Sequence, residues 1–237
     1  MKYLGNIITK NPITPVGSSA PGIWKLNDIS RYKYNGSWPG NTFLTNNLVT
    51  GGAASGTGTS FSCVYPSGIQ AGDWLICYGS YGSATSGVTV SGYTVSGNSS
   101  GYQWVAVKNA TGSESGTNLS VTIPVSTWYS AEVVKLTPLS PCTPSYVALM
   151  GAYSADGVVN SPLGFSDPAE DDIQIAFFAI NGARTLTTAP NNYPYSITTK
   201  TTSPTLFSWY ALNRGVSDIT AQFSGATNIR VACIKAI

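Results

Sequence analysis

The sequence contains no histidine, and this absence excludes several kinds of functional site. A Ser-His-Asp triad and a Cys-His dyad both use an imidazole to take the proton of the nucleophile. Zinc sites built from Cys and His are disfavoured too, because the four cysteines form no Cys-x-x-Cys pair. We therefore expect a protein that is not an enzyme and that uses no metal and no cofactor.

Charged residues and long apolar runs are scarce as well. Charged residues make up 9% of the 237 residues, against about 25% in ordinary soluble domains. Aromatic residues reach 11%, which argues against disorder. The net charge of +2 is too small to predict nucleic-acid binding, and no run approaches the roughly 18 apolar residues of a membrane helix. Hydroxyl and amide groups must dominate the surface, as in β-proteins that pack against copies of themselves or work outside the cell.

The N-terminus lacks the apolar segment of a signal peptide, although the composition suits an extracellular protein. Release by lysis reconciles these two features and predicts a location in a virion. The cysteines do not require disulfides by their spacing, and buried free thiols are the simpler expectation. They are Cys63, Cys77, Cys142 and Cys233.

Short apolar or alternating runs, separated by Gly, Pro, Asn and Ser, predict an all-β fold. The first group of predicted strands comprises 60–65, 73–78, 88–95, 102–108, 118–123 and 128–136. The second group comprises 145–152, 157–160, 172–179, 195–201, 206–213, 219–223 and 229–234. Residues 45–60, rich in Gly, Ser, Thr and Asn, are expected to be a connector and the start of the first sandwich.

Three prolines within 138–144 predict a short stiff linker between two domains. We expect an N-terminal anchoring arm with a short helix (1–50), followed by two tandem antiparallel β-sandwich domains of jelly-roll or immunoglobulin-like type (51–140 and 141–237).

The two halves also repeat one another in sequence. Asp73 matches Asp172 at the head of an apolar strand, and Trp104 matches Trp209 in an aromatic strand. The runs 119–123 and 133–136 match 219–223 and 231–234, and Glu132 has Arg230 as its counterpart. An acid at the start of a strand can accept hydrogen bonds from the preceding loop. A duplicated domain favours scaffolding over catalysis.

The N-terminal arm is basic and carries one short amphipathic segment. Asn27 or Asp28 can cap a short helix that ends at Gly36. So small a unit cannot bury two tryptophans, and its apolar face predicts docking onto another surface of this chain or of a partner. The predicted partner-docking residues are Trp24, Leu26, Ile29, Tyr32 and Trp38.

Aromatic side chains beside Ser, Gly and Asn form a second set of candidates, for contact with a glycan or a neighbouring subunit. They are expected at exposed loops, although ordinary hairpin tips would look the same. The set is Tyr78, Tyr81, Trp128, Tyr129, Tyr193 and Tyr195.

Acidic residues leave two further alternatives open. The run DPAEDD, with Asp167, Glu170, Asp171 and Asp172, can supply oxygen ligands to Ca²⁺ but lacks the spacing of a Ca²⁺ loop. Glu114, Glu132 and Glu170 leave paired-carboxylate glycoside hydrolysis open, although no pair recurs in both halves.

Two segments resemble virion proteins. The segment 20–40 resembles an N-terminal element of tail-fibre-like and other virion proteins of marine and cyanobacterial bacteriophages; the residues that match are Gly22, Trp24, Leu26, Asp28, Tyr32, Gly36, Trp38 and Pro39. The segment 71–123 is similar to a β-sandwich unit of phage appendage and capsid-associated proteins. There the matches are Gly72, Asp73, Lys108, Ala110, Thr111, Gly112, Ser113 and Glu114.

The resemblance implies a virion structural protein, tail-associated or head-decorating, whose partners are further copies of itself and capsid or tail proteins. A carbohydrate-binding adhesin that contacts a host glycan is the alternative. A polysaccharide-degrading enzyme with carboxylate catalysis is the third hypothesis.

Overall fold

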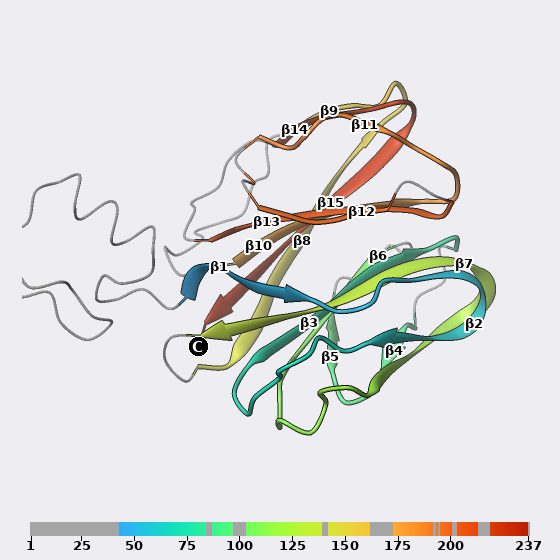
Figure 1. Cartoon of the computed structure of the whole chain (residues 1–237). Coiled ribbons are helices and arrows are strands. Elements are labelled where there is room, and N and C mark those ends of the chain that lie inside the picture. The colour runs from blue at the N-terminus through green and yellow to red at the C-terminus, as the bar shows by residue number, and fades with distance from the viewer. Residues whose placement is uncertain are drawn as a thin grey trace, which may run out of the picture.

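The computed structural model describes residues 43–83, 87–96, 103–138, 142–161, 173–191, 193, 195–200, 203–212 and 219–236. Within these ranges every regular element is a β-strand and every pairing is antiparallel (Figure 1). The prediction of an all-β fold is confirmed. Residues 1–42 of the predicted N-terminal arm (1–50), with its expected helix, lie outside the described residues, whereas residues 43–50 form a strand of the first sheet.

The first sheet has seven strands, with order β1-β7-β3-β6-β5 and with β2 and β4 also paired to β7. Its strands are β1 (Phe43–Thr50), β2 (Ala54–Val64), β3 (Trp74–Tyr81), β4 (Thr89–Val90), β5 (Thr94–Ser96), β6 (Gln103–Asn109) and β7 (Asn118–Pro138). The long strand β7 runs through two layers, because its first half pairs with β4 and its second half with β1 and β3. The sheet therefore curls over its own core.

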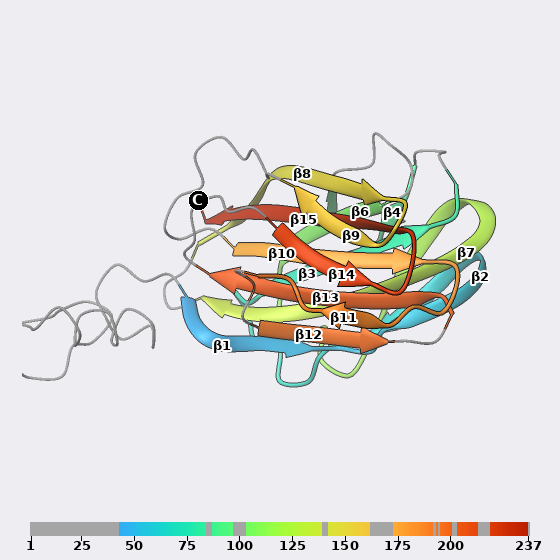
Figure 2. The same ribbon diagram turned by 90° about the horizontal axis from the view of Figure 1, so that it is seen from above.

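The second half of the chain forms two separate sheets. A five-stranded sheet has the order β12-β13-β10-β15-β8, and a three-stranded sheet has the order β11-β14-β9. The strands are β8 (Pro144–Ser154), β9 (Val158–Ser161), β10 (Ile173–Ile180), β11 (Leu186–Thr188), β12 (Tyr195–Lys200), β13 (Thr205–Leu212), β14 (Ile219–Phe223) and β15 (Thr227–Ala236). Figures 1 and 2 show the sheets stacked as layers, with the five-stranded sheet between the other two.

The strand order of the first sheet recurs in the second: β1-β7-β3-β6-β5 corresponds to β8-β15-β10-β13-β12. Trp74 of β3 stands opposite Leu136, and Ile173 of β10 stands opposite Ile234. The predicted match of 133–136 with 231–234 agrees with this register.

The predicted match of Trp104 with Trp209 is two residues out of register. Trp104 stands opposite Gly79, five residues into β3 from Trp74. The corresponding residue of β10 is Phe178, which stands opposite Phe207. Side chains alternate along a strand, so an offset of two leaves both tryptophans on the same type of face.

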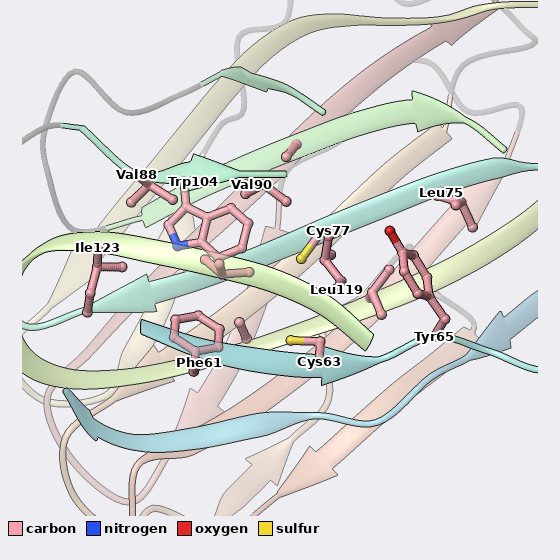
Figure 3. Close-up of a cluster of buried hydrophobic side chains, with 14 of the residues drawn as sticks. Phe61, Cys63, Tyr65, Leu75, Cys77, Val88, Val90, Trp104, Leu119 and Ile123 are labelled. Carbon is pink, nitrogen blue, oxygen red and sulfur yellow. The ribbon is translucent and has the colours of Figure 1, made fainter. Parts of the chain in front are cut away.

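Three buried clusters hold the layers together. The first lies inside the curled first sheet and includes Trp104, Phe61 and Leu119 (Figure 3). The second, here called the inter-sheet core, joins the first sheet to the five-stranded sheet and includes Trp74 and Phe177. The third joins the five-stranded and three-stranded sheets. All eight residues of β3 are buried because both faces of this strand are covered.

Residues 45–60 are not a connector, because β1 and most of β2 occupy them. Their composition favours a loop, but pairing with β7 overrides this local preference. Glycine is required where the chain turns between the two strands: a Cβ at Gly51 would stand 2.2 Å from the backbone oxygen of Val64.

The predicted strands 118–123 and 128–136 also form one element, β7, instead of two. Side chains along the first half of β7 alternate between buried and exposed, and the second half becomes almost continuously buried as the strand enters the inter-sheet core. The prediction of buried free thiols is confirmed for Cys63 and Cys77, which are fully buried in the first cluster, whereas Cys142 is only partly buried.

Candidate functional site

A buried group of polar side chains lies in the inter-sheet core, where four strands contribute one residue each. Tyr78 and Glu132 stand opposite each other on β3 and β7, and Thr198 and Ser208 stand opposite each other on β12 and β13. We call these four residues the Glu132 cluster. Glu132 is 1% exposed, and Tyr78 and Ser208 are fully buried.

Hydrogen bonds in the Glu132 cluster cross from one sheet to the other. Thr198 Oγ1 donates to Glu132 Oε1 at 2.7 Å. The Tyr78 hydroxyl lies 2.9 Å from Glu132 Oε2 and 2.9 Å from Ser208 Oγ. Beside it, the rings of Tyr78 and Phe177 lie 5.2 Å apart. The cluster therefore links the two sheets through directional bonds within an otherwise apolar core.

Burial governs the protonation of this cluster. Desolvation raises the pKa of Glu132, and the hydrogen bonds from Thr198, Tyr78 and Ser208 offset only part of that effect. Burial also raises the pKa of Tyr78 well above its ordinary value, and the nearby Glu132 carboxylate adds to the rise. A tyrosine and a carboxyl group held in this way act as a fixed bridge, since the carboxyl is enclosed by both sheets.

Asp73, the second buried acid, closes the loop before β3. Its Oδ2 accepts a hydrogen bond from the Gln70 backbone N–H at 2.8 Å, and its Oδ1 accepts one from Thr137 Oγ1 at 2.6 Å. Lys135 Nζ lies 3.6 Å away and also donates to the Gly68 carbonyl at 3.0 Å. The expectation that an acid here caps the preceding loop is confirmed for Asp73; Asp172 lies outside the described residues.

Glu114 fixes the connection between β6 and β7. Its carboxylate accepts hydrogen bonds from the backbone N–H groups of Thr111 and Gly112, at 2.9–3.1 Å. It also accepts one from Thr111 Oγ1 at 3.0 Å and forms an ion pair of 2.8 Å with Lys108. Despite partial desolvation, these donors lower the pKa of Glu114 to about 2. The group is therefore ionised and fully engaged near neutral pH.

Glu114 and Glu132 occupy different parts of the fold and do not form a catalytic pair. Glu114 lies in the β6–β7 connection, whereas Glu132 lies between two sheets. Glu170, the third carboxylate considered, is outside the described residues, as is the whole DPAEDD run. Among the residues that the structure describes, no group of three or more Cys, Asp or Glu is arranged to hold a metal ion.

Three of the predicted contact aromatics are buried, so the expectation that they sit on exposed loops is wrong. Tyr78 and Tyr81 are fully buried, and both belong to β3, which is covered on both faces. Tyr193 is 3% exposed, packs in the third cluster and donates a hydrogen bond to Gln174 at 3.1 Å. Gly and Ser around Tyr78 and Tyr81 suggested turns, but both tyrosines belong to a strand; Tyr193 lies outside the strands, and its ring is nevertheless buried.

Trp128 and Tyr129 are partly exposed at the bend of β7. The Tyr129 ring stacks on Phe61 at a centroid distance of 4.0 Å and an angle of 8°. The Trp128 indole lies against Gly82, where a Cβ would come within 2.1 Å of its Nε1. The core thus fixes both rings while leaving part of each at the surface. Tyr195 lies on β12 at the register position opposite Tyr210.

The predicted partner-docking residues Trp24, Leu26, Ile29, Tyr32 and Trp38 all lie outside the described residues. In the part of the chain that is described, no helix has the length and apolarity to cross a bilayer.

Sequence reasoning missed the partners of the buried acids. Thr198 and Ser208 are hydroxyl residues that nothing in the sequences of β12 and β13 distinguishes, and only the packing of these paired strands on the first sheet brings them to Glu132. The one available signal was Glu132 itself, an acid within an apolar run of β7.

No protein-family model matches this chain, and neither the curated proteins nor the solved structures contain a significant match to it.

Proposed function

We propose that this chain is a non-enzymatic structural subunit of a bacteriophage virion, associated with the tail or decorating the head. In this proposal residues 1–42 dock onto neighbouring capsid or tail proteins, or onto further copies of the chain, because residues 43–50 of the expected arm are paired into the first sheet as β1. The body projects from that attachment as two β-sandwich domains of jelly-roll or immunoglobulin-like type, 51–140 and 141–237.

The observation that carries the proposal is the use of the acidic side chains. Three of the four acids in the described ranges, Asp73, Glu114 and Glu132, are buried and accept hydrogen bonds that hold the fold together. The fourth, Asp156, is exposed, and its Oδ1 accepts the backbone N–H of nearby Val158 at 3.1 Å. A glycosidase needs a carboxyl that can protonate a leaving group and a second that faces the same substrate. Acids engaged as structural bridges favour scaffolding.

The stacked layers provide a second line of support. Three buried clusters succeed one another across the molecule, and the inter-sheet core ties the two halves of the chain together. Contact between layers on this scale resists relative motion of the halves. Such a body suits a projecting building block better than a site that must open and close around a substrate.

A deletion tests the docking role of the N-terminal segment. Because the paired strands begin at Phe43, removal of residues 1–42 is expected to leave a folded, soluble body. Particles assembled in the presence of the deleted chain are purified by density gradient and probed with an antibody against the body. We expect the full chain to band with particles and the deleted chain to remain at the top.

The double variant Trp24→Ala/Trp38→Ala is a second test of the same segment, because it keeps the chain length and the charge. It should reduce incorporation as the deletion does. Normal incorporation of the deleted chain would refute docking through this segment.

The partly exposed rings at the bend of β7 favour a second candidate, a carbohydrate-binding adhesin. Trp128 and Tyr129 offer rigid aromatic surface, held by Gly82 and Phe61. Under this alternative a glycan array of host polysaccharides should give signals that Trp128→Ala and Tyr129→Ala both abolish. Silence across the array would eliminate it.

A further inference from the structure

A concave site of about 350 Å³ opens beside the β6–β7 connection, away from both the Glu132 cluster and the β7 bend. This volume lies at the lower end of the range of small-molecule sites, about 300–1,000 Å³. Buried Tyr65 and Leu119 contribute to its lining, together with Lys108 and Glu114. We call this concavity the β6–β7 pocket.

The walls of the β6–β7 pocket are fixed by hydrogen bonds before any ligand arrives. Glu114 holds Thr111 and Gly112, as described above, and the Glu114 carbonyl accepts Thr117 Oγ1 at 2.8 Å and the Thr117 N–H at 3.0 Å. The Thr117 carbonyl in turn accepts the backbone N–H of Tyr65 at 3.1 Å. A preorganised wall lowers the entropy lost on binding.

Lys108 is the charged donor of the pocket. Its ammonium group carries three N–H bonds, and one of them is used by Glu114 at 2.8 Å. The group also lies 5.4 Å from the centre of the Tyr93 ring, and the side chain keeps 20% of its surface exposed. Because Glu114 neutralises its charge, Lys108 presents donors without making the pocket a strong anion site.

The rim consists of exposed neutral polar groups, contributed by Ser91, Ser113, Asn118 and Ser120. Hydroxyl and amide groups each donate and accept hydrogen bonds. A ligand that matches this rim carries several neutral hydroxyl groups at close spacing, since Tyr65 and Leu119 are core residues that expose only 7% and 2% of their surface. An anion would have only Lys108 as a cationic partner, and Lys108 is already paired with Glu114. An apolar ligand would leave the polar groups of the rim without hydrogen-bond partners.

We propose that the β6–β7 pocket binds a neutral saccharide, one or two residues at the end of a glycan chain. This proposal uses no residue of the N-terminal segment and none of the predicted contact aromatics. It therefore stands or fails separately from the docking role and from the adhesin alternative at Trp128 and Tyr129.

The test uses saturation-transfer difference NMR on the full chain, with the methyl glycosides of glucose, galactose and mannose as probes at about 10 mM, roughly ten times a dissociation constant of 1 mM. N-acetylneuraminate and inorganic phosphate serve as charged probes at the same concentration. At least one neutral glycoside should receive saturation, and the two charged probes should not.

Variants locate the binding. Asn118→Ala and Ser120→Ala remove rim groups, and Ser91→Trp fills the mouth; each should weaken the responding glycoside at least tenfold. Thr122→Ala is the matched control, because Thr122 is exposed on the same face of β7 but does not line the pocket. It should bind as the unchanged chain does.

Three results would overturn the proposal: no response from any neutral glycoside, a response that survives Ser91→Trp and Asn118→Ala unchanged, or binding of the charged probes alone. Circular dichroism of each variant separates loss of binding from loss of fold.

Discussion

Replacing Glu132 with glutamine removes a buried ionisable group while keeping the shape of the side chain. The amide oxygen can still accept from Thr198, and the amide N–H group can donate to the Tyr78 oxygen, leaving the phenol proton for Ser208. Loss of two charge-assisted bonds, about 1.5–3 kcal/mol each against about 1 for neutral ones, is offset by the removal of the desolvation cost. We expect the free energy of unfolding near pH 7 to change by less than about 1 kcal/mol.

The pH dependence of the free energy of unfolding gives a sharper prediction. The pKa of Glu132 is raised in the folded state, so folding favours the protonated carboxyl. The contribution of Glu132 is then fully present below the unfolded pKa of about 4.3 and is lost as pH rises through the folded pKa, with a slope of at most about 1.4 kcal/mol per pH unit. The Glu132→Gln variant lacks this decline, and its stability advantage over the unchanged chain should grow as pH rises above about 4.3.

Glu132→Ala separates the bridge from the charge. This variant leaves the partly buried Thr198 hydroxyl without its acceptor, at about 1–3 kcal/mol, and leaves Ser208 as the acceptor of the Tyr78 hydroxyl. It also adds a cavity between the sheets. We expect a loss of about 3–4 kcal/mol at pH 7. Urea unfolding from pH 4 to 9, followed by tryptophan fluorescence, measures all three proteins. A Glu132→Gln variant that loses as much as Glu132→Ala, or that keeps the pH slope of the unchanged chain, would refute the reasoning.

Two further variants test other parts of the fold. Glu114→Gln should lower stability at neutral pH: because the pKa of Glu114 is about 2, its contribution is present above the unfolded value and is lost as pH falls from about 4.3 towards 2. The shift corresponds to about 3 kcal/mol, which solvent at the pocket reduces to about 1–2; a variant that unfolds in acid as the unchanged chain does would contradict this. Gly79→Ala should cost about 1–3 kcal/mol in urea unfolding, because the new Cβ would meet Ala131 Cβ at 2.7 Å and Trp104 Cζ2 at 2.9 Å. An unchanged unfolding midpoint would show that β3 and β7 are not packed this closely.

A strand could be predicted from the sequence where its own residues follow a strong hydrophobic pattern. The runs at β3, β6, β10 and β13 are apolar or aromatic because both faces of these strands are buried. The bounds of β6, β10 and β13 were predicted to within one residue, and the predicted β3 ended three residues early. The sequence repeat between the two halves could be recognised for the same reason.

Strands that depend on a partner were harder to predict. The strand β1 and the first part of β2 have the composition of a connector, and β11 has three residues. Their hydrogen bonds come from β7 and β14, which lie far away in sequence. Local propensity carries no record of such pairing.

The candidate sites show the same limit. Tyr beside Gly and Ser predicted exposed loops, whereas Tyr78 and Tyr81 lie in a strand covered by two layers. That a second sheet packs on β3 follows from the association of the two halves, which no single run of residues encodes. The Glu132 cluster is a product of that association. The β6–β7 pocket lies within the first half of the chain, where the pairing of strands brings Tyr65, Lys108 and Asn118 to one concavity.

The most direct measurement of the central claim is a particle reconstruction by electron cryomicroscopy. It is made on virions purified from a lysate in which this chain is present. The account predicts density for the stacked β-layers outside the particle wall, with residues 1–42 in contact with a neighbouring subunit and Trp24 and Trp38 covered by it. Virions that contain no copy of the chain, or copies whose N-terminal residues contact no neighbour, would contradict it.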